Sequence, residues 1–425
     1  MRVHIVGAGP TGLSLAWEIL RFTPHDVIVY DRKPSAGGSW WEPTVGERDL
    51  HSHRIVFDRA YVNTKSLFGE MGIRWNSVFQ RSEGNFNKAV LSRLQGGDYL
   101  TLLTLAGKVL GNPRKYRRMS LKDAVGRLST GGEEVLSNFP LIMDGVDWTR
   151  MTAWEFVKSF DYVALSTQYT QRVSGKVMCD HMQRAVEVAG GQFVFGVELQ
   201  DVEYFPEGFI ANFDKHPPVT DGLLVLCVDH APARRLVKDN WGVDAVDVLR
   251  GSTYGALNVL LDYASPVEHI DMYEAAMGTR WKIIPSVLSD GHTVSCVIPL
   301  VTPEIETTPE DALVREVVSQ LGLPPPVRGR VAWGSHWNGS KWTFSQSSGV
   351  LSPVRQLPFW GKSSVVAMCG MMSPHRTPFA SIETSVEVSR KFCHETFATR
   401  TPLEPFLLTH LLWLLLIVLV LMILQ

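Results

Sequence analysis

The 425-residue sequence predicts an α/β fold, and three observations indicate it. A short apolar run at 3–6 ends in the turn G-A-G-P-T-G, and a helical pattern follows. A second apolar run at 27–30 ends at Asp31. After residue 173, a helical segment that runs to residue 189 is followed by strand-like runs at 192–199, 202–205, 209–213 and 223–228. The chain is longer than one ordinary domain, so we expect a second domain beside this sheet.

The order strand, glycine turn, helix, strand and acid is typical of a Rossmann-like dinucleotide-binding domain. In that arrangement Gly7 permits a tight turn, Gly9 lets the backbone approach a pyrophosphate, and Gly12 lets the helix pack against the strand. The helix N-terminus faces the phosphates. Asp31 accepts hydrogen bonds from a ribose hydroxyl. The predicted cofactor contacts of this stretch are Gly7, Gly9, Pro10, Thr11, Gly12 and Asp31.

The amino-acid composition limits the classes of protein and of partner that fit this chain. Hydrophobic residues make up 45% of the chain and charged residues 20%, which is typical of a globular protein. The formal net charge of −2 gives no indication of a nucleic-acid partner. The five cysteines show no C-x-x-C spacing, which argues against a zinc site or a disulfide framework and fits a reducing compartment.

Residues 406–424 form a nearly unbroken apolar run, which predicts a C-terminal transmembrane helix. At about 1.5 Å per residue, this length just spans a hydrocarbon core of about 30 Å. Arg390, Lys391 and Arg400 lie on its N-terminal side, so we expect a tail-anchored protein whose globular part is cytosolic. The alternative is a buried core helix.

Three further patterns strengthen the dinucleotide prediction. Gly37-Gly38-Ser39 follow soon after Asp31, an N-x-x-x-L-x-x-x-x-G stretch begins at Asn63, and an I-E pair stands at Ile382-Glu383. Together with the glycine turn, these patterns resemble the superfamily of flavin-containing amine oxidases, phytoene desaturases and protoporphyrinogen oxidases. The resemblance implies that the dinucleotide is FAD. It adds these expected cofactor contacts: Arg32, Gly37, Gly38, Ser39, Leu199, Gly370, Ile382 and Glu383.

The resemblance also implies a discontinuous architecture. The FAD-binding domain would consist of residues 1–75, 175–235 and 360–395. An inserted α+β substrate domain would consist of residues 76–174 and 236–359. Strand-like runs at 256–263, 281–287 and 293–299 predict a second sheet in that domain, and residues 120–128 read as a helix.

The sequence departs from the family pattern at three places. Met371 follows Gly370 where the family has an aspartate that helps to hold FAD. Thr384-Ser385 replace the G-A that follows the I-E pair. The strand near residues 254–263 lacks the lysine that amine oxidases commonly keep near the flavin.

Two segments leave alternatives open. The basic segment 112–118 either touches anionic lipid headgroups or is a solvated turn. Trp337, Trp342 and Phe344 either wall a substrate cavity or pack as ordinary strand residues.

The sequence therefore predicts an FAD-dependent oxidoreductase that oxidises a small or lipophilic substrate by hydride transfer. The alternative is a membrane-anchored scaffold or binding protein without catalysis, which the missing aspartate motivates. A flavin monooxygenase, suggested by Gly37 to Trp40, would carry a second G-x-G-x-x-G that this sequence lacks. No catalytic residue and no metal site is assigned. His51, His53 and Arg54 lie either near the flavin or in structural roles.

Overall fold

A parallel sheet forms the centre of one half of the molecule. The computed structural model describes residues 1–41, 44–45, 48–49, 55–82, 90–242, 244–245, 253–254, 256–288, 290–332, 334–344, 349–350 and 356–412. Within these residues the sheet has five strands, in the order β20 (Val366–Met368), β11 (Leu223–Leu226), β1 (Arg2–Val6), β2 (Asp26–Asp31) and β8 (Gln192–Phe195). All neighbouring pairs are parallel. Segments far apart in sequence thus form one sheet.

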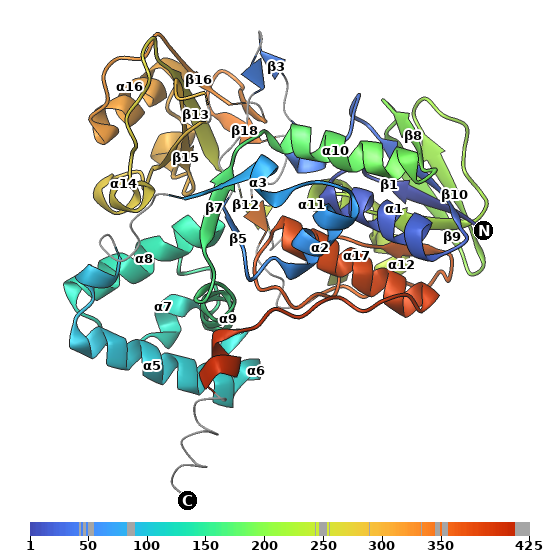
Figure 1. Cartoon of the computed structure of the whole chain (residues 1–425), viewed down its shortest axis with the longest axis horizontal. Helices are drawn as coiled ribbons and strands as arrows, with labels where there is room; N and C mark the ends of the chain where they lie inside the picture. The colour runs from blue at the N-terminus through green and yellow to red at the C-terminus, as the bar shows by residue number, and fades with distance from the viewer. Residues whose placement is uncertain are drawn as a thin grey trace, which may run out of the picture.

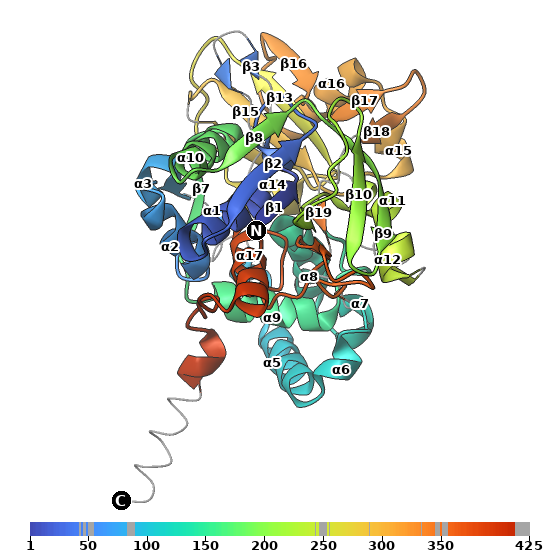
Figure 2. The same cartoon turned by 90° about the vertical axis from the view of Figure 1, so that its right-hand side faces the viewer.

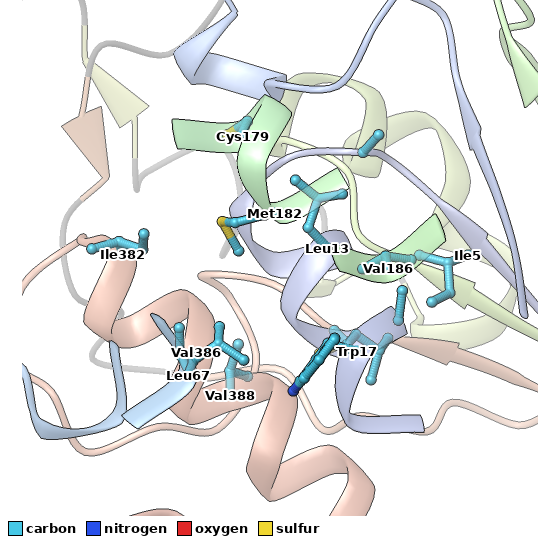
Figure 3. Packing of buried hydrophobic residues seen from close by; sticks show 14 of the residues in the cluster. Ile5, Leu13, Trp17, Leu67, Cys179, Met182, Val186, Ile382, Val386 and Val388 are labelled. Carbon is cyan, nitrogen blue, oxygen red and sulfur yellow. The ribbon is translucent and has the colours of Figure 1, made fainter. Parts of the chain in front are cut away.

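Three helices cover one face of this sheet: α1 (Pro10–Phe22), α10 (Gly175–Val188) and α17 (Ile382–Phe397) (Figure 1). Figure 3 shows Leu13 and Trp17 of α1 lying between Met182 of α10 and Val386 of α17. These side chains are buried because α1 is apolar on both of its flanks, so it packs between two neighbours instead of lying at the surface.

The opposite face is covered by β9 (Leu199–Phe205), β10 (Gly208–Phe213) and α11 (His230–Leu236). The sequence predicted one strand over 192–199, and this was wrong. The chain leaves the sheet at Phe195, turns at Gly196 with φ +73°, and begins β9 at Leu199. The turn brings Leu199 to the edge where β1 and β2 end.

A second, antiparallel sheet lies where the sequence predicts it. Its order is β14 (Ile284–Val287), β15 (Thr293–Ile298), β13 (Leu257–Asp262) and β16 (Arg328–Val331), and α16 (Glu310–Leu321) packs on one face. Trp337 of β17 (Ser335–Trp337) and Trp342 of β18 (Trp342–Phe344) join that same packing. The Trp342 indole donates to Thr308 O at 2.8 Å. These aromatic side chains are therefore ordinary core residues.

A group of helices completes the molecule below this sheet in Figure 1: α5 (Gly96–Gly111), α6 (Pro113–Tyr116), α7 (Leu121–Ala124), α8 (Thr130–Asp144) and α9 (Ala153–Val163). The prediction of one helix over 120–128 was wrong, because α7 ends at Ala124 and α8 follows. Helix α8 contains Gly131, Gly132 and Pro140, which disfavour helix in isolation. Ser129 caps it, accepting from Gly132 N at 3.0 Å.

The remaining elements are short connections or small sheets. They are η1 (Gly38–Trp40), β3 (Thr44–Val45), β4 (Arg48–Asp49), β5 (Ile55–Phe57), α2 (Val62–Glu70), α3 (Trp75–Val78), β6 (Phe79–Arg81), η2 (Leu91–Arg93), β7 (Gln168–Gln171), α12 (Lys238–Trp241), β12 (Thr253–Tyr254), α14 (Met272–Gly278), α15 (Pro303–Glu306) and β19 (Gly349–Val350).

The segment after α17 is held against the body of the molecule. Arg400 donates to Glu18 of α1 at 2.6 Å and to Glu70 of α2 at 2.7 Å. Burial alone would raise the pKa of Glu70, but hydrogen bonds from Arg400 and Ser66 outweigh it and lower the pKa to about 2. The fully buried Glu18 also pairs with Arg390 at 2.8 Å. Four charged groups thus fix the start of the C-terminal segment.

The predicted transmembrane helix lies mostly outside the described residues, which end at 412. Among the residues that the structure does describe, no helix combines the length and apolar character needed to cross a bilayer. The span at 406–424 therefore stays a prediction.

Candidate functional site

A cavity of about 500 Å³ joins the carboxyl edge of the parallel sheet to the second sheet. At the sheet edge its walls come from the segments that directly follow β1, β2, β11 and β20. Farther on, its walls come from β5, α8, β13, β14 and β15. We call these the nucleotide end and the substrate end. In open parallel sheets, ligands bind outside the carboxyl ends of the strands, which is where this cavity lies.

The glycine turn shapes the nucleotide end. Gly7 has φ +112°, and a Cβ there would lie 2.3 Å from Cys227 O, so the position requires glycine. A Cβ on Gly12 would lie 1.9 Å from Gly7 O, which shows why α1 packs so closely on β1. Gly38 has φ +55°, and a Cβ there would lie 2.6 Å from Gly9 Cα. The pair Gly37-Gly38, which we call the twin glycine, therefore brings a second backbone segment against the turn. Gly9 and Gly38 both line the cavity.

Asp31 lies at the end of β2 and is buried. Its Oδ2 accepts from Ala8 N at 2.7 Å, and its Oδ1 accepts from Lys33 N at 2.8 Å. These two bonds fix the carboxylate at the cavity wall. Each carboxylate oxygen has more than one lone pair, so Asp31 still has capacity to accept from a ligand hydroxyl.

Lys33 supplies a cation to the same wall. Its ammonium donates to Gly38 O. Burial lowers the pKa of Lys33 to about 8, while the nearby Asp31 opposes the shift. Arg32 also lines the cavity and lies 3.8 Å from Glu198, which Arg235 approaches at 3.2 Å. The nucleotide end thus combines exposed backbone amides, a fixed carboxylate and cations, a set that suits an anionic dinucleotide.

The far wall of the nucleotide end consists of the turn after β20 and the start of α17. Gly370, Met371 and Met372 line it, so no carboxylate follows Gly370. Ser373 closes this turn, accepting from Gly370 N at 3.1 Å and donating to Met368 O at 3.0 Å. Helix α17 begins after Ser381, and Ser381, Ile382 and Ser385 line the cavity, so the N-terminus of this helix lies at the far wall.

The substrate end is apolar. Its described lining comprises mainly aliphatic and aromatic side chains and contains no charged group; it includes Ile55, Phe57, Tyr61, Leu141, Ile142, Met143, Leu257, Leu260, Ile284, Val297 and Phe379. Asn258 is a polar exception. Its Oδ1 accepts from Ser295 Oγ at 3.0 Å, whereas its Nδ2 is buried and has no hydrogen-bond partner in the described part of the chain. A buried donor without a partner is costly, so a ligand acceptor at this point would relieve it.

Comparisons with known proteins agree with this geometry. A sequence profile of NAD(P)-binding Rossmann-like domains matches residues 5–60. No curated protein sequence matches the chain. A putrescine oxidase structure with bound putrescine superposes with a TM-score of 0.66 at 15% identity, covering 94% of this chain and 100% of its own. The chain has the amine oxidase and protoporphyrinogen oxidase fold.

Two more structures with this fold match with slightly lower scores. A protein from Exiguobacterium, provisionally assigned as a protoporphyrinogen oxidase, gives a TM-score of 0.63 at 12% identity over 93% of this chain and 98% of its own. An oxidoreductase from Methanosarcina mazei gives 0.64 at 14% identity over 91% of this chain and 99% of its own. The predicted resemblance to the superfamily is thus confirmed for the fold. Identities this low do not establish the reaction.

Most of the predicted cofactor residues meet at the cavity. Those that line it are Gly7, Gly9, Pro10, Thr11, Asp31, Arg32, Gly38, Ser39, Leu199, Gly370 and Ile382. Their contact with FAD stays a prediction. Gly12 lies behind the wall, as its packing role implies. His51, His53 and Arg54 lie outside the described residues.

Two predicted contacts lie away from the cavity. Gly37 supports the glycine turn from behind, donating its N–H to Ala8 O at 2.9 Å. Glu383 faces α2, where it accepts from the backbone amides of Asn63 and Thr64 at 2.9 and 2.8 Å. Successive residues of a helix differ by about 100° in direction. Ile382 therefore faces the cavity while Glu383 faces the neighbouring helix.

Sequence reasoning missed several lining residues, among them Lys33, Cys227, Asp229, Ser381 and Ser385. The first three share a detectable signal. Each lies within three residues of the end of a strand of the parallel sheet, and the carboxyl ends of such strands form the ligand edge. Applying that rule to β2 and β11 would have found them.

Proposed function

We propose that the protein is an FAD-dependent oxidoreductase that oxidises an uncharged, lipophilic substrate. The observation that carries this proposal is the continuous cavity, which has a dinucleotide-type wall at one end and an apolar wall at the other. The sequence resemblance supports FAD over other dinucleotides, and the shared fold with oxidase structures supports oxidation.

Each part of the chain has a role in this proposal. The amides after Gly9 and at the start of α17 bind the anionic part of FAD, and Asp31 orients a ribose. When bound, FAD supplies the hydride-accepting chemistry. The apolar walls from β13 and α8 exclude water and orient the substrate beside the reacting ring.

The lining of the substrate end supports the substrate class. Putrescine, the ligand in the matching oxidase structure, is a diamine that carries positive charge at neutral pH. Burying such a cation requires a carboxylate partner, and the substrate end has none among its described lining residues. The absence of the family lysine from β13 agrees with a substrate other than an amine.

The proposal includes a location. The apolar run at 406–424 would anchor the protein in a membrane by its C-terminus, with the globular part in the cytosol. A bilayer would then also be the source of a lipophilic substrate.

A visible absorbance spectrum of the purified protein tests the cofactor. We expect an oxidised-flavin spectrum, either as purified or after addition of FAD. Anaerobic bleaching of that spectrum by porphyrinogens or polyenes, and not by putrescine, would test the substrate class.

The replacement of the family aspartate by Met371 favours a second candidate. A protein that lacks this carboxylate and binds no flavin would act as a scaffold or binding partner. The same spectrum separates the two functions, because a colourless protein that ignores added FAD would contradict the oxidoreductase.

A further inference from the structure

Helix α5 exposes a stripe of leucines that the proposed oxidoreductase function does not use. Leu100, Leu103 and Leu110 are 67%, 71% and 53% exposed. Together with Gly107 they follow a spacing of three, four and three residues, which places them on one side of a helix. The opposite side already packs in the core through Leu105 and Val109. Helix α5 is thus apolar on two sides, and in the described part of the chain one of them is exposed.

Basic residues follow these leucines closely in the sequence. Between Asp98 and Asp123 the sequence contains six basic residues and no acidic one. The basic residues are Lys108, Arg114, Lys115, Arg117, Arg118 and Lys122. All six are exposed, and the first five lie on α5 and α6 or directly after α6. Arg117 lies over the ring of Trp154 with 4.3 Å to its centroid. We define the α5–α6 face as the three leucines together with these five exposed basic residues.

The C-terminal segment reaches the same end of the molecule. Thr409 donates from its backbone N to Asp161 of α9 at 2.8 Å and from its Oγ1 at 3.0 Å. Helix α9 packs directly on α5 and α6. In both views α5 and α6 lie at the end of the molecule where the described chain stops (Figures 1 and 2). The apolar run that continues from residue 406 therefore starts beside α9, at the end of the molecule that also carries α5 and α6.

We propose that the α5–α6 face lies on the surface of an anionic lipid bilayer. Leucines flanked by basic residues are the composition with which an interfacial helix lies in a headgroup layer. Trp154 beside Arg117 suits the same depth, because tryptophan favours the membrane interface. A second copy of the chain would bring equal positive charges together, which disfavours it as the occupant.

Docking by this face goes beyond a C-terminal anchor alone. The contacts of Arg400 and Thr409 leave little free chain between the body and the apolar run. They would hold one side of the protein against the membrane instead of letting the body tumble above it. The helical group that contains α8, whose Leu141 to Met143 line the substrate end, would then face the bilayer.

Fluorescent labels at two positions test the proposal in the full-length protein. Leu103→Cys places a thiol on the face, and Val188→Cys places a control thiol at the end of α10, 90% exposed and far from α5 (Figure 1). Four native cysteines are buried and Cys227 is half-buried, so an NBD label reacts mainly with the introduced thiol. Each labelled protein is mixed with vesicles of phosphatidylcholine alone or with added phosphatidylserine.

We expect the label at 103, and not the label at 188, to brighten roughly twofold or more with phosphatidylserine vesicles and to be quenched by nitroxide lipids. Combining Leu103→Cys with Arg114→Glu and Lys115→Glu should abolish the dependence on phosphatidylserine. Equal responses at the two positions, or no response at 103, would overturn the proposal. Brightening at 103 without vesicles would show that a second copy covers the face and would overturn it as well.

Discussion

The two ends of the cavity are built by different means. At the nucleotide end, the backbone determines the shape of the wall. A Cβ on Gly38 would lie 2.6 Å from Gly9 Cα, and two backbone amides fix the Asp31 carboxylate. At the substrate end, apolar side chains from several distant segments form the wall. Backbone constraints demand particular residues in a particular order, whereas many apolar side chains fill a wall equally well. The first end is therefore specific to a ligand class and the second tolerates variation.

Substitution of Gly38, at the nucleotide end, has the largest expected effect on FAD affinity. We expect Gly38→Ala to weaken FAD binding about 100-fold or more, which is about 3 kcal/mol, because its Cβ would lie 2.6 Å from Gly9 Cα. Gly72→Ala is the matched control, since Gly72 also has positive φ but a Cβ there meets nothing within 4 Å. Titration with FAD followed by fluorescence measures both. Equal affinities in the two variants would contradict the role of the Gly9–Gly38 contact.

Asp31 gives the next largest effect. We expect Asp31→Ala to weaken FAD binding about 10- to 100-fold, because a charge-assisted hydrogen bond contributes about 1.5–3 kcal/mol. Asp26→Ala, at the exposed start of the same strand, should leave the affinity unchanged. The same fluorescence titration compares them. If both variants bind like the unaltered protein, Asp31 does not contact the cofactor.

A polar substitution at the substrate end should spare the cofactor and affect the other ligand. We expect Leu260→Asn to leave FAD affinity unchanged and to weaken binding of the apolar dye Nile red to the FAD-loaded protein about tenfold, since burying an amide without a partner costs about 1–3 kcal/mol. Leu300→Asn is the control, because Leu300 is 38% exposed and does not line the cavity. Loss of FAD binding in Leu260→Asn would contradict the assignment of FAD and substrate to separate ends of the cavity.

We expect the charge of Lys33 to make FAD affinity at the nucleotide end depend on pH. Below its pKa of about 8 in the free protein, Lys33 is charged and would attract the anionic FAD; above it, the charge is lost. FAD affinity should therefore fall by a few-fold as pH rises above about 8. Calorimetric titrations from neutral to alkaline pH measure this. Lys33→Gln should bind more weakly at neutral pH and remove the fall, and an unchanged profile in that variant would assign the pH dependence elsewhere.

The two ends also differ in how far the sequence predicts them. The glycine turn, Asp31 and the twin glycine could be located because their spacing follows from local backbone geometry. The split of residues 192–199 into two strands depended on a turn at Gly196, and the orientation of Glu383 depended on packing against α2. Helix α8 forms despite its glycines and proline because Ser129 and the surrounding core stabilise it. Such tertiary effects have no local sequence signal.

The visible spectrum of the purified full-length protein tests the central claim most directly. Although Met371 replaces the family aspartate, the nucleotide end keeps its glycine turn, its carboxylate and its cations. We therefore predict the absorbance of bound oxidised flavin, with FAD released on denaturation. A correctly folded, colourless protein that does not bind added FAD would contradict the account.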